Sequence, residues 1–320
     1  MRILLTTTSY QDTPGKHHDI LAASGFDVAR ARGPLTEQQM LDLVKGEGFD
    51  GLLNGDDQIT QKVIDASLPR LRVIAKYGIG LDSIDVKYAT SKKIPVLFTP
   101  GVNHTTVAEH TFGLMICLAK HFWPHVKSVK SGGWKRMTGS ELAGKTIAIL
   151  GMGRIGKEVA KRARAFDMNV KGFDLYWDEH FAKACSVDRC TTAEIALQDA
   201  DIISLHMNLD ENNRGFINKT RIAAMKKGAV IINTARGGLV NEADVAEACK
   251  SGQLGGYGAD VLDHEPPKPG HPFNEIDNIL ITPHIGSRTF ESVERQAMRA
   301  TLNIVNFLNG DKDYIQANTF

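Results

Sequence analysis

Three ionisable residues in the second half of the chain have the types and the placement that proton transfer on a small organic acid would need. Arg236, Glu265 and His284 each follow a run of apolar residues that is typical of a buried strand. The carboxyl ends of neighbouring parallel strands meet at one rim of a sheet, where ligands bind. We therefore expect the three side chains to lie near one another.

These residue types suit hydride transfer between a cofactor and a keto or hydroxy acid. Histidine exchanges protons near neutral pH, so His284 can act as acid and base for the reacting oxygen. A carboxylate such as Glu265 holds the ring in one tautomer and stabilises its charged form. Arginine binds a carboxylate through paired hydrogen bonds, which fits Arg236 as the substrate anchor. Each residue alone also suits a structural role, but their joint placement favours the catalytic interpretation.

A glycine-rich turn has the spacing of a dinucleotide-binding loop. It follows Thr146–Leu150, which predicts a buried strand, and precedes Lys157–Phe166, which predicts a helix. Gly151 permits the tight turn, Gly153 lets the backbone approach a pyrophosphate, and Gly156 lets the helix pack closely on the strand. The free N–H groups at the start of the helix would then bind the phosphates.

A second strand and an acidic residue complete this pattern. Met168–Phe173 predicts the strand, and Asp174 stands at its end. A carboxylate there accepts hydrogen bonds from the ribose hydroxyls of NAD and repels the additional phosphate of NADP. Because Leu175, Tyr176 and Trp177 supply no cation for that phosphate, the sequence predicts NAD as the cofactor.

Composition excludes several classes of protein. The chain has 320 residues, 42% hydrophobic and 23% charged, which suits two folded domains rather than disorder. Its net charge of +1 favours neither a nucleic acid nor a membrane surface as a partner. The apolar runs are too short for a signal peptide or a transmembrane helix. The four cysteines lack metal-ligand spacing, so we expect a cytoplasmic protein with free thiols and no metal.

Both halves of the chain alternate short apolar strands with helices, which is typical of α/β domains with parallel sheets. Strands are expected near 3–5, 27–29, 51–53, 73–75, 96–98, 146–150, 169–173, 201–205, 229–233, 256–260 and 279–281. The segment 36–44 predicts a helix with Thr36 as its N-cap. We therefore expect two Rossmann-like, doubly wound domains with an active-site cleft between them.

Two longer helices are also expected. Thr106–His121 is apolar on nearly all sides, which predicts burial at a domain or dimer interface. The preceding Thr99–Gly101 contains proline and glycine and suggests a crossing between domains. Glu291–Leu308 predicts a last helix that stops at Asn309-Gly310, because glycine favours helix ends.

The sequence resembles the D-isomer-specific 2-hydroxyacid dehydrogenase family over nearly its whole length. The segments that carry the resemblance are Gly78–Asp82, Val107–His110, Ile232–Val240, Ala259–Pro266 and Thr282–Gly286. The resemblance implies a discontinuous substrate domain, 1–99 plus 291–320, and an NAD-binding domain, 100–290. It also implies a homodimer formed through the NAD-binding domain.

Site residues follow from the same resemblance. It implies that His284 is the acid and base, that Glu265 is its partner and that Arg236 anchors the substrate carboxylate. It places Ile79 and Gly80 in a loop that binds the same carboxylate. The residues expected at the NAD site are Thr106, Gly151, Gly153, Arg154, Ile155, Gly156, Asp174, His206, Thr234, Ala235, Asp260 and Gly286.

Within the family, the sequence is most similar to the short form of the phosphoglycerate dehydrogenase branch, and no C-terminal regulatory domain is expected. That branch often has Arg-Ser where this chain has Asn54-Gly55, and the acids Asp56 and Asp57 that follow do not suit a phosphate. A hydroxypyruvate or glyoxylate reductase is therefore an alternative. A non-catalytic NAD-sensing protein of the corepressor type is another, because it uses the same fold. Formate dehydrogenase fits less well, since it usually pairs the histidine with glutamine.

Overall fold

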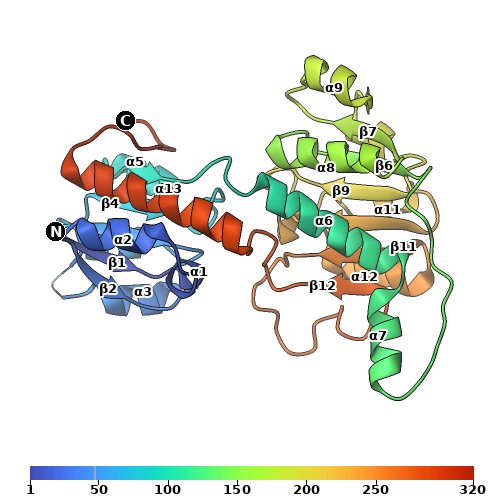
Figure 1. Cartoon of the computed structure of the whole chain (residues 1–320), viewed down its shortest axis with the longest axis horizontal. Coiled ribbons are helices and arrows are strands. Elements are labelled where there is room, and N and C mark those ends of the chain that lie inside the picture. Colours follow the sequence, from blue (N-terminus) through green and yellow to red (C-terminus); the bar gives the residue numbers. More distant parts are fainter. Residues whose placement is uncertain (47) are drawn as a thin grey trace. The chain divides into compact units, whose positions relative to one another are not determined.

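The computed structural model describes residues 1–46 and 48–320, which form two compact units (Figure 1). Unit 1 comprises Met1–Asn103 and Arg288–Phe320, and unit 2 comprises His104–Ser287. The sequence predicts boundaries at 99/100 and 290/291, a few residues away. The segment after residue 99 stays with unit 1 because the carbonyl of Val102 accepts a hydrogen bond from Arg295 at 3.0 Å.

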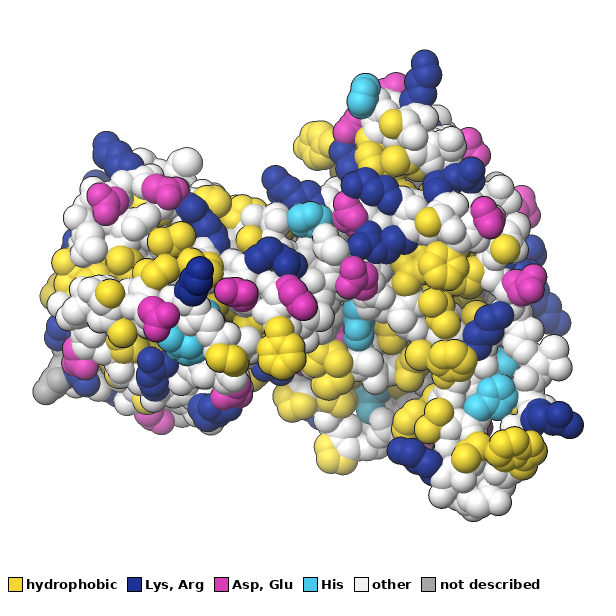
Figure 2. Space-filling view, viewed as in Figure 1, with side chains coloured by type: hydrophobic (Ala, Val, Ile, Leu, Met, Phe, Trp, Pro, Cys, Tyr) yellow, Lys and Arg dark blue, Asp and Glu magenta, His cyan; other side chains and the backbone are white. Residues whose placement is uncertain are grey.

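The surface carries mixed charge. Figure 2 shows basic and acidic side chains interspersed on the visible face, and the net charge of the chain is +1. In the part of the chain that the structure describes, no helix is long and apolar enough to cross a membrane. All four cysteines, Cys117, Cys185, Cys190 and Cys249, are free thiols.

Unit 1 is built on a five-stranded parallel sheet in the order β2-β1-β3-β4-β5. The strands are β1 Arg2–Leu5, β2 Asp27–Arg30, β3 Gly51–Asn54, β4 Val73–Lys76 and β5 Val96–Leu97. The helices are α1 Thr8–Asp12, α2 Lys16–Ala23, α3 Glu37–Val44, α4 Gln61–Ser67, α5 Val86–Ser91 and α13 Phe290–Asn309. The strand order reverses beside β1, as in other doubly wound sheets.

Alternate strand residues of unit 1 fill two separate cores. Leu4 and Leu52 pack with buried residues of α3 and α4 on one face of the sheet. Ile3 packs with Ala297 and Ile304 of α13 on the other face. A strand that is buried on both faces reads as a continuous apolar run, which is why these strands are visible in the sequence. The last long helix of the chain thus completes the core around the first strand.

Local signals fix the ends of two helices as the sequence predicts. The Thr36 side chain accepts a hydrogen bond from the Gln39 amide, and the Gln39 side chain accepts one from the Thr36 amide. This reciprocal pair is a capping box at the start of α3. At the end of α13, Gly310 has φ of 88°, the left-handed conformation that glycine adopts without strain.

Unit 2 is built on a seven-stranded parallel sheet in the order β12-β11-β10-β9-β6-β7-β8. The strands are β6 Thr146–Leu150, β7 Asn169–Phe173, β8 Val187–Arg189, β9 Ile202–Leu205, β10 Ala229–Asn233, β11 Leu254–Ala259 and β12 Ile279–Ile281. The helices are α6 His104–Ala119, α7 Phe122–Lys130, α8 Arg154–Ala165, α9 Glu179–Cys185, α10 Ala193–Leu197, α11 Lys219–Ala223 and α12 Glu242–Ser251, with a 3-10 turn at Gly237–Leu239. Both units are therefore Rossmann-like, as predicted.

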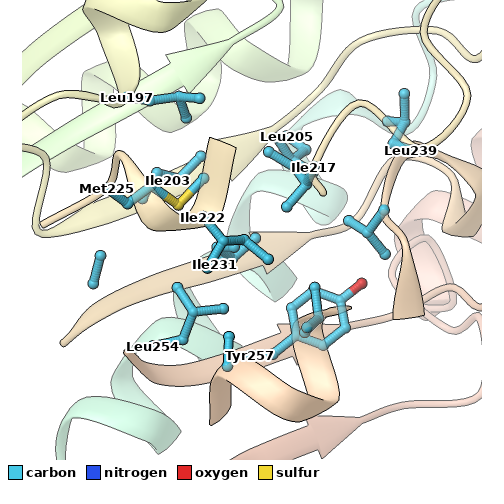
Figure 3. Close-up of a cluster of buried hydrophobic side chains, with 14 of the residues drawn as sticks. Leu197, Ile203, Leu205, Ile217, Ile222, Met225, Ile231, Leu239, Leu254 and Tyr257 are labelled. Carbon is cyan, nitrogen blue, oxygen red and sulfur yellow. The ribbon is translucent and has the colours of Figure 1, made fainter. Parts of the chain in front are cut away.

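The two faces of this sheet are also separately packed. On one face, Ile203, Ile231 and Tyr257 lie in a large apolar cluster that includes residues of α10, α11 and α12 (Figure 3). On the other face, Ile147 and Ile149 pack against α6 and α8. Burial on both faces leaves the ends of the strands as the places where polar side chains can gather.

Two helices differ from their predicted forms. α8 begins at Arg154 rather than Lys157, because Gly153 is its N-cap and Gly156 already belongs to its first turn. α6 begins and ends two residues earlier than predicted. It packs on α8, β10 and β11 of its own unit. Its apolar character therefore reflects burial within unit 2.

Candidate active site

The sheet order brings three loops to one rim of unit 2. β10, β11 and β12 are adjacent and parallel, and their carboxyl ends point the same way. Arg236 follows β10, Glu265 follows β11 and His284 follows β12. The rim thus carries all three residues that the sequence assigns to catalysis.

His284 and Glu265 form a hydrogen-bonded pair. Nδ1 of His284 lies 2.8 Å from Oε2 of Glu265, and the other carboxylate oxygen accepts a hydrogen bond from the Leu262 amide at 2.9 Å. A carboxylate only accepts hydrogen bonds, so Nδ1 of the neutral ring carries the proton. The proton that the ring exchanges with another molecule must then pass through Nε2. The two side chains are 42% and 36% exposed, so the pair is accessible.

The backbone of His284 is held in an uncommon conformation. Its φ is 52°, in the left-handed region, which costs a residue other than glycine roughly 1 kcal/mol or more. The His284 amide donates to the carbonyl of Asp260 at 3.0 Å. The next two amides donate to the Asp260 carboxylate, from Ile285 at 2.9 Å and from Gly286 at 2.6 Å. Several hydrogen bonds to one buried residue therefore offset the strain.

Asp260 is ionised in this environment. Burial raises the pKa of Asp260, but hydrogen bonds from His110, Thr282 and the Ile285 amide outweigh burial and hold the pKa below its ordinary value. The Asp260 side chain is only 4% exposed. A buried, charged carboxylate with several donors is a rigid element of the rim.

Arg236 is positioned through its backbone. Its carbonyl accepts a hydrogen bond from the buried Asn233 side chain at 2.9 Å, and its Nη1 donates to the Ala235 carbonyl at 2.7 Å. A Cβ on the next residue, Gly237, would lie 1.9 Å from the carbonyl carbon of Leu262. Gly237 is therefore required for the loops of Arg236 and Glu265 to approach each other. The sequence alone gave Gly237 no role, although the pair Gly237-Gly238 was the available signal.

The glycine turn has the geometry of a dinucleotide cradle. Gly151 has φ of 97°, and a Cβ there would lie 2.5 Å from the backbone of His206. A Cβ on Gly156 would lie 2.0 Å from the Gly151 carbonyl oxygen, so α8 packs directly on the turn. A Cβ on Gly153 would instead enter open space, with no atom within 4 Å. Because no side chain caps α8, its first N–H groups face a space that a phosphate can occupy.

Asp174 stands beside this cradle, at the end of β7. Its Oδ2 accepts a hydrogen bond from the Met152 amide at 2.6 Å, and its Oδ1 accepts one from the Tyr176 amide at 2.8 Å. These bonds fix the carboxylate next to the glycine turn. A carboxylate has about four acceptor positions, so capacity remains for ribose hydroxyls. The residues present therefore fit an NAD molecule.

We expect Gly153→Ala to change cofactor binding and Gly156→Ala to change stability. The first should leave the melting temperature almost unchanged but weaken NADH binding about tenfold or more, through loss of backbone contacts worth about 1.5–3 kcal/mol. The second should destabilise the protein by about 1–3 kcal/mol, since the backbone must move. Thermal unfolding and NADH fluorescence titration measure both. Early melting of Gly153→Ala, or undiminished NADH binding by it, would contradict this assignment.

The other residues expected at the NAD site lie in or near the same unit. Nε2 of His206 lies 2.8 Å from the Ser204 hydroxyl, and burial lowers the pKa of His206 to about 3, so its ring is neutral. The hydroxyl of Thr234 lies 2.9 Å from that of Thr111 on α6. The residues Thr106, Arg154, Ile155, Ala235 and Gly286 are also in unit 2. Their contacts with NAD stay predictions.

The residues expected to bind the substrate carboxylate from the first half lie in unit 1. Ile79 and Gly80 follow β4, and Ile79 is exposed. The start of their loop is fixed, because the Gly78 amide donates to the Thr99 hydroxyl at 3.0 Å. The Thr99 amide in turn donates to the Gly78 carbonyl. Their role towards a substrate stays a prediction.

The two acids after β3 have partners within unit 1. Asp57 is fully buried and accepts hydrogen bonds from the Gly55 amide at 2.9 Å and from the Thr6 hydroxyl. Asp56 lies 2.6 Å from the ammonium group of Lys76, whose side chain is 2% exposed. Asp57 is therefore not exposed, as the expectation that both acids face a phosphate would require, whereas its effect on a substrate stays a prediction. The charge of Asp56 is balanced by a nearby cation.

The fold and the cradle define a dinucleotide-binding α/β protein, and comparison with known proteins identifies its family. Residues 112–286 match the family described as D-isomer specific 2-hydroxyacid dehydrogenase, NAD binding domain. The chain is 37% identical over 313 residues to D-3-phosphoglycerate dehydrogenase from Methanocaldococcus jannaschii, an alignment that covers 97% of this chain and 58% of that protein. It is 42% identical over 242 residues to hydroxypyruvate reductase from Thermotoga maritima, covering 74% and 78% respectively.

A solved structure shares the fold of the whole chain. The crystal structure of TT0316 protein from Thermus thermophilus is 36% identical, with a TM-score of 0.90 and coverage of 99% of this chain and 100% of that one. The chain therefore belongs to the D-isomer specific 2-hydroxyacid dehydrogenase family, and NAD is its cofactor, as the sequence predicts. It spans little more than half the length of the phosphoglycerate dehydrogenases that it matches.

Proposed function

We propose that the protein is an NAD-dependent D-2-hydroxyacid dehydrogenase that interconverts a small 2-hydroxy acid and the corresponding 2-keto acid. The observation that carries this proposal is the 2.8 Å contact between His284 and Glu265, on a rim that also bears Arg236. When bound, the cofactor would supply a hydride as NADH during reduction or accept one as NAD during oxidation, at its nicotinamide ring. The chain itself must then bind the acid, orient it and transfer one proton.

Each residue of the rim has a defined task in this proposal. Nε2 of His284 gives a proton to the substrate oxygen during reduction and removes it during oxidation. Glu265 keeps the Nδ1–H tautomer and stabilises the charged ring. Arg236 binds the substrate carboxylate, which holds the reacting carbon in one orientation. Asp260 and the loop that it fixes position His284.

For the substrate, we propose an acid of the phosphoglycerate dehydrogenase type. The relative from M. jannaschii supports this choice, and the Asp57 carboxylate is buried within unit 1, so it cannot contact a substrate phosphate directly. Hydroxypyruvate or glyoxylate is the second candidate. The relative from T. maritima supports that reading, as does the absence of an arginine at Asn54-Gly55.

The experiment that tests this function is NADH oxidation at neutral pH with a panel of 2-keto acids. The panel contains 3-phosphohydroxypyruvate, hydroxypyruvate, glyoxylate and pyruvate, each at matched ionic strength. We expect turnover with at least one of them, and the highest kcat/KM identifies the substrate. Tight NADH binding without turnover on the panel would favour an NAD-sensing protein of the corepressor type.

We expect Asp174→Ala to weaken selection for NAD. Loss of a charged acceptor for the ribose hydroxyls costs about 1.5–3 kcal/mol, so the KM for NAD should rise about tenfold or more. The relative kcat/KM for NADP should improve, because its phosphate no longer meets a carboxylate. Steady-state kinetics with both cofactors measures the change. Asp188→Ala, which removes an exposed acid on β8, is the control and should alter neither value.

We further propose that the protein is a homodimer formed through α7 of unit 2. No residue of α7 is buried, although several of its side chains are large and apolar. Trp123, Val126 and Val129 are 58%, 45% and 54% exposed, and Trp134 after the helix is 78% exposed. Figure 2 shows hydrophobic side chains on this part of the surface. A cavity of about 140 Å³ beside α7 is lined by Leu118, Trp123 and β12 residues, among others. An apolar patch of this kind marks a binding surface.

Sedimentation of Trp123→Glu tests the dimer. The unchanged chain should sediment with about twice its mass of 35.0 kDa. The variant should dissociate at micromolar concentration, because a buried unpaired carboxylate costs several kcal/mol. Phe320→Glu, at an equally apolar and exposed position of unit 1, is the control and should stay dimeric. A monomeric unchanged protein, or a variant that remains dimeric, contradicts the proposal.

A cytoplasmic location is also part of the proposal. All four thiols are free, and burial raises the pKa of Cys249 to about 12, so this thiol is unreactive. Free thiols suit a reducing compartment. Cell fractionation with a tagged chain tests the location.

A further inference from the structure

A partly buried hydrogen-bond network links α6 to the loop that carries His284. Nε2 of His110 lies 2.9 Å from the hydroxyl of Thr282 and 3.4 Å from Oδ1 of Asp260. The Thr282 hydroxyl donates to the same Oδ1 at 2.6 Å. Because that hydroxyl gives its proton to Asp260, its oxygen accepts from the Nε2–H of His110. The three side chains therefore form one directed chain of hydrogen bonds.

The network ends on the backbone around His284. The Asp260 carboxylate accepts from the amides of Ile285 and Gly286, and the Asp260 carbonyl accepts from the His284 amide. A Cβ on Gly286 would lie 2.7 Å from Oδ2 of Asp260. The Asp260 carboxylate therefore lies so close to the backbone at residue 286 that only glycine fits there. Any rotation of the Asp260 carboxylate would move the peptides that hold His284 at its left-handed φ of 52°.

The side chains of the network are largely shielded from water. His110 is 21% exposed and Asp260 is 4% exposed. A hydrogen bond that is lost in such a place is replaced only partly by water, and the remaining partners rotate to regain one. The orientation of the Asp260 carboxylate therefore depends on the donors from Thr282 and His110.

We propose that His110 is a positioning residue for the acid–base pair: through Thr282 and Asp260 it fixes the 284–286 backbone, so that Nδ1 of His284 faces Glu265. His110 touches neither the acid–base pair nor, in this proposal, the substrate. Its effect is on the orientation of the His284 ring. This inference rests on the proposed function only for its kinetic consequence, since the orientation itself is a property of unit 2.

Two substitutions that differ in reach test the proposal. The terminal amide of glutamine can replace Nε2 of histidine, whereas the amide of asparagine reaches only the position of Nδ1. His110→Gln should therefore keep the contact to Thr282, and His110→Asn should lose it. With the best keto acid of the panel and saturating NADH, we expect His110→Asn to lower kcat about tenfold or more, with KM nearly unchanged. His110→Gln should stay within about twofold of the unchanged protein.

A spectroscopic measurement separates positioning from simple structural support. Nitrogen-15 imidazole spectra report the tautomer of His284, whose signals are those missing in His284→Asn. We expect His110→Asn to shift these signals towards a mixture of tautomers, and His110→Gln to leave them in place. A fall in melting temperature with unchanged His284 signals would overturn the proposal, as would equal kcat losses in both variants.

A second pair covers the case in which His110→Asn does not fold. Thr282→Ser keeps the hydroxyl that relays the contact, and Thr282→Val removes it with little change of shape. The proposal requires Thr282→Val to reproduce the kinetic and spectral changes and Thr282→Ser to avoid them. The tautomer spectra need no turnover. A protein that shows the spectral change but reduces no keto acid would retain this inference and refute the proposed function.

Discussion

His284→Ala should lower kcat by about 10²- to 10⁴-fold while the dissociation constant of NADH changes little. In the proposal, the His284 ring donates the proton. It donates from Nε2, because Nδ1 contacts Glu265 at 2.8 Å, and alanine removes this donor. The residues proposed to bind NADH, the glycine cradle and Asp174, belong to other loops of unit 2. Stopped-flow hydride transfer and NADH fluorescence titration measure the two quantities.

Glu265→Gln is the matched variant for this measurement. Its amide keeps the size of the side chain and can still accept a hydrogen bond from Nδ1, but it cannot stabilise the charged ring. Its kcat should therefore lie between those of the unchanged protein and His284→Ala. If His284→Ala retains the kcat of the unchanged protein, another group donates the proton. If it loses NADH affinity and kcat to the same extent, the substitution has damaged the site as a whole.

Arg236→Ala should raise the KM of the keto acid about 10²-fold or more. Two charge-assisted hydrogen bonds to a carboxylate are worth about 3 kcal/mol or more, and about 1.4 kcal/mol corresponds to a tenfold change. Arg236→Lys should recover little, because an ammonium group cannot form the paired hydrogen bonds of the guanidinium. The backbone should keep its place in both variants, since Asn233 holds the Arg236 carbonyl.

Keto acid saturation curves at fixed NADH provide the test for Arg236. NADH affinity serves as the internal control and should be unchanged in both variants. A lysine variant with nearly full activity would show that a single positive charge is sufficient, and it would remove the argument for bidentate binding. An alanine variant with normal KM would exclude Arg236 as the anchor and leave the loop of Ile79 and Gly80 as the remaining candidate.

The strands and the rim were predictable because their signals are local or periodic. β6, β9 and β10 are buried on both faces, which produces runs of mostly apolar residues. The cradle glycines were visible because their spacing is local, and Gly151 and Gly156 are each required by a close backbone approach. The position of a residue after a strand then determined which side chains share an edge.

Other features depend on long-range packing and left little trace in the sequence. Short helices such as α10 and α11 have only five residues, too few to show a helical period. In the sequence, Asp57 cannot be distinguished from an exposed acid. Only the fold shows that it is buried and accepts hydrogen bonds from Thr6 and Gly55. His110 lies far from residue 284 in sequence, so only the folded sheet reveals that a helix near the start of unit 2 supports the end of β12.

The division of unit 1 between the two ends of the chain has a consequence for biosynthesis. β1 and β3 leave the ribosome early, but one of their faces is covered by α13, which is made only after unit 2. Unit 2 is contiguous in sequence and can form its own core before α13 covers the sheet of unit 1. The nascent chain therefore carries an exposed apolar sheet during most of its synthesis. Chaperone binding should concentrate on the first hundred residues until α13 has been synthesised.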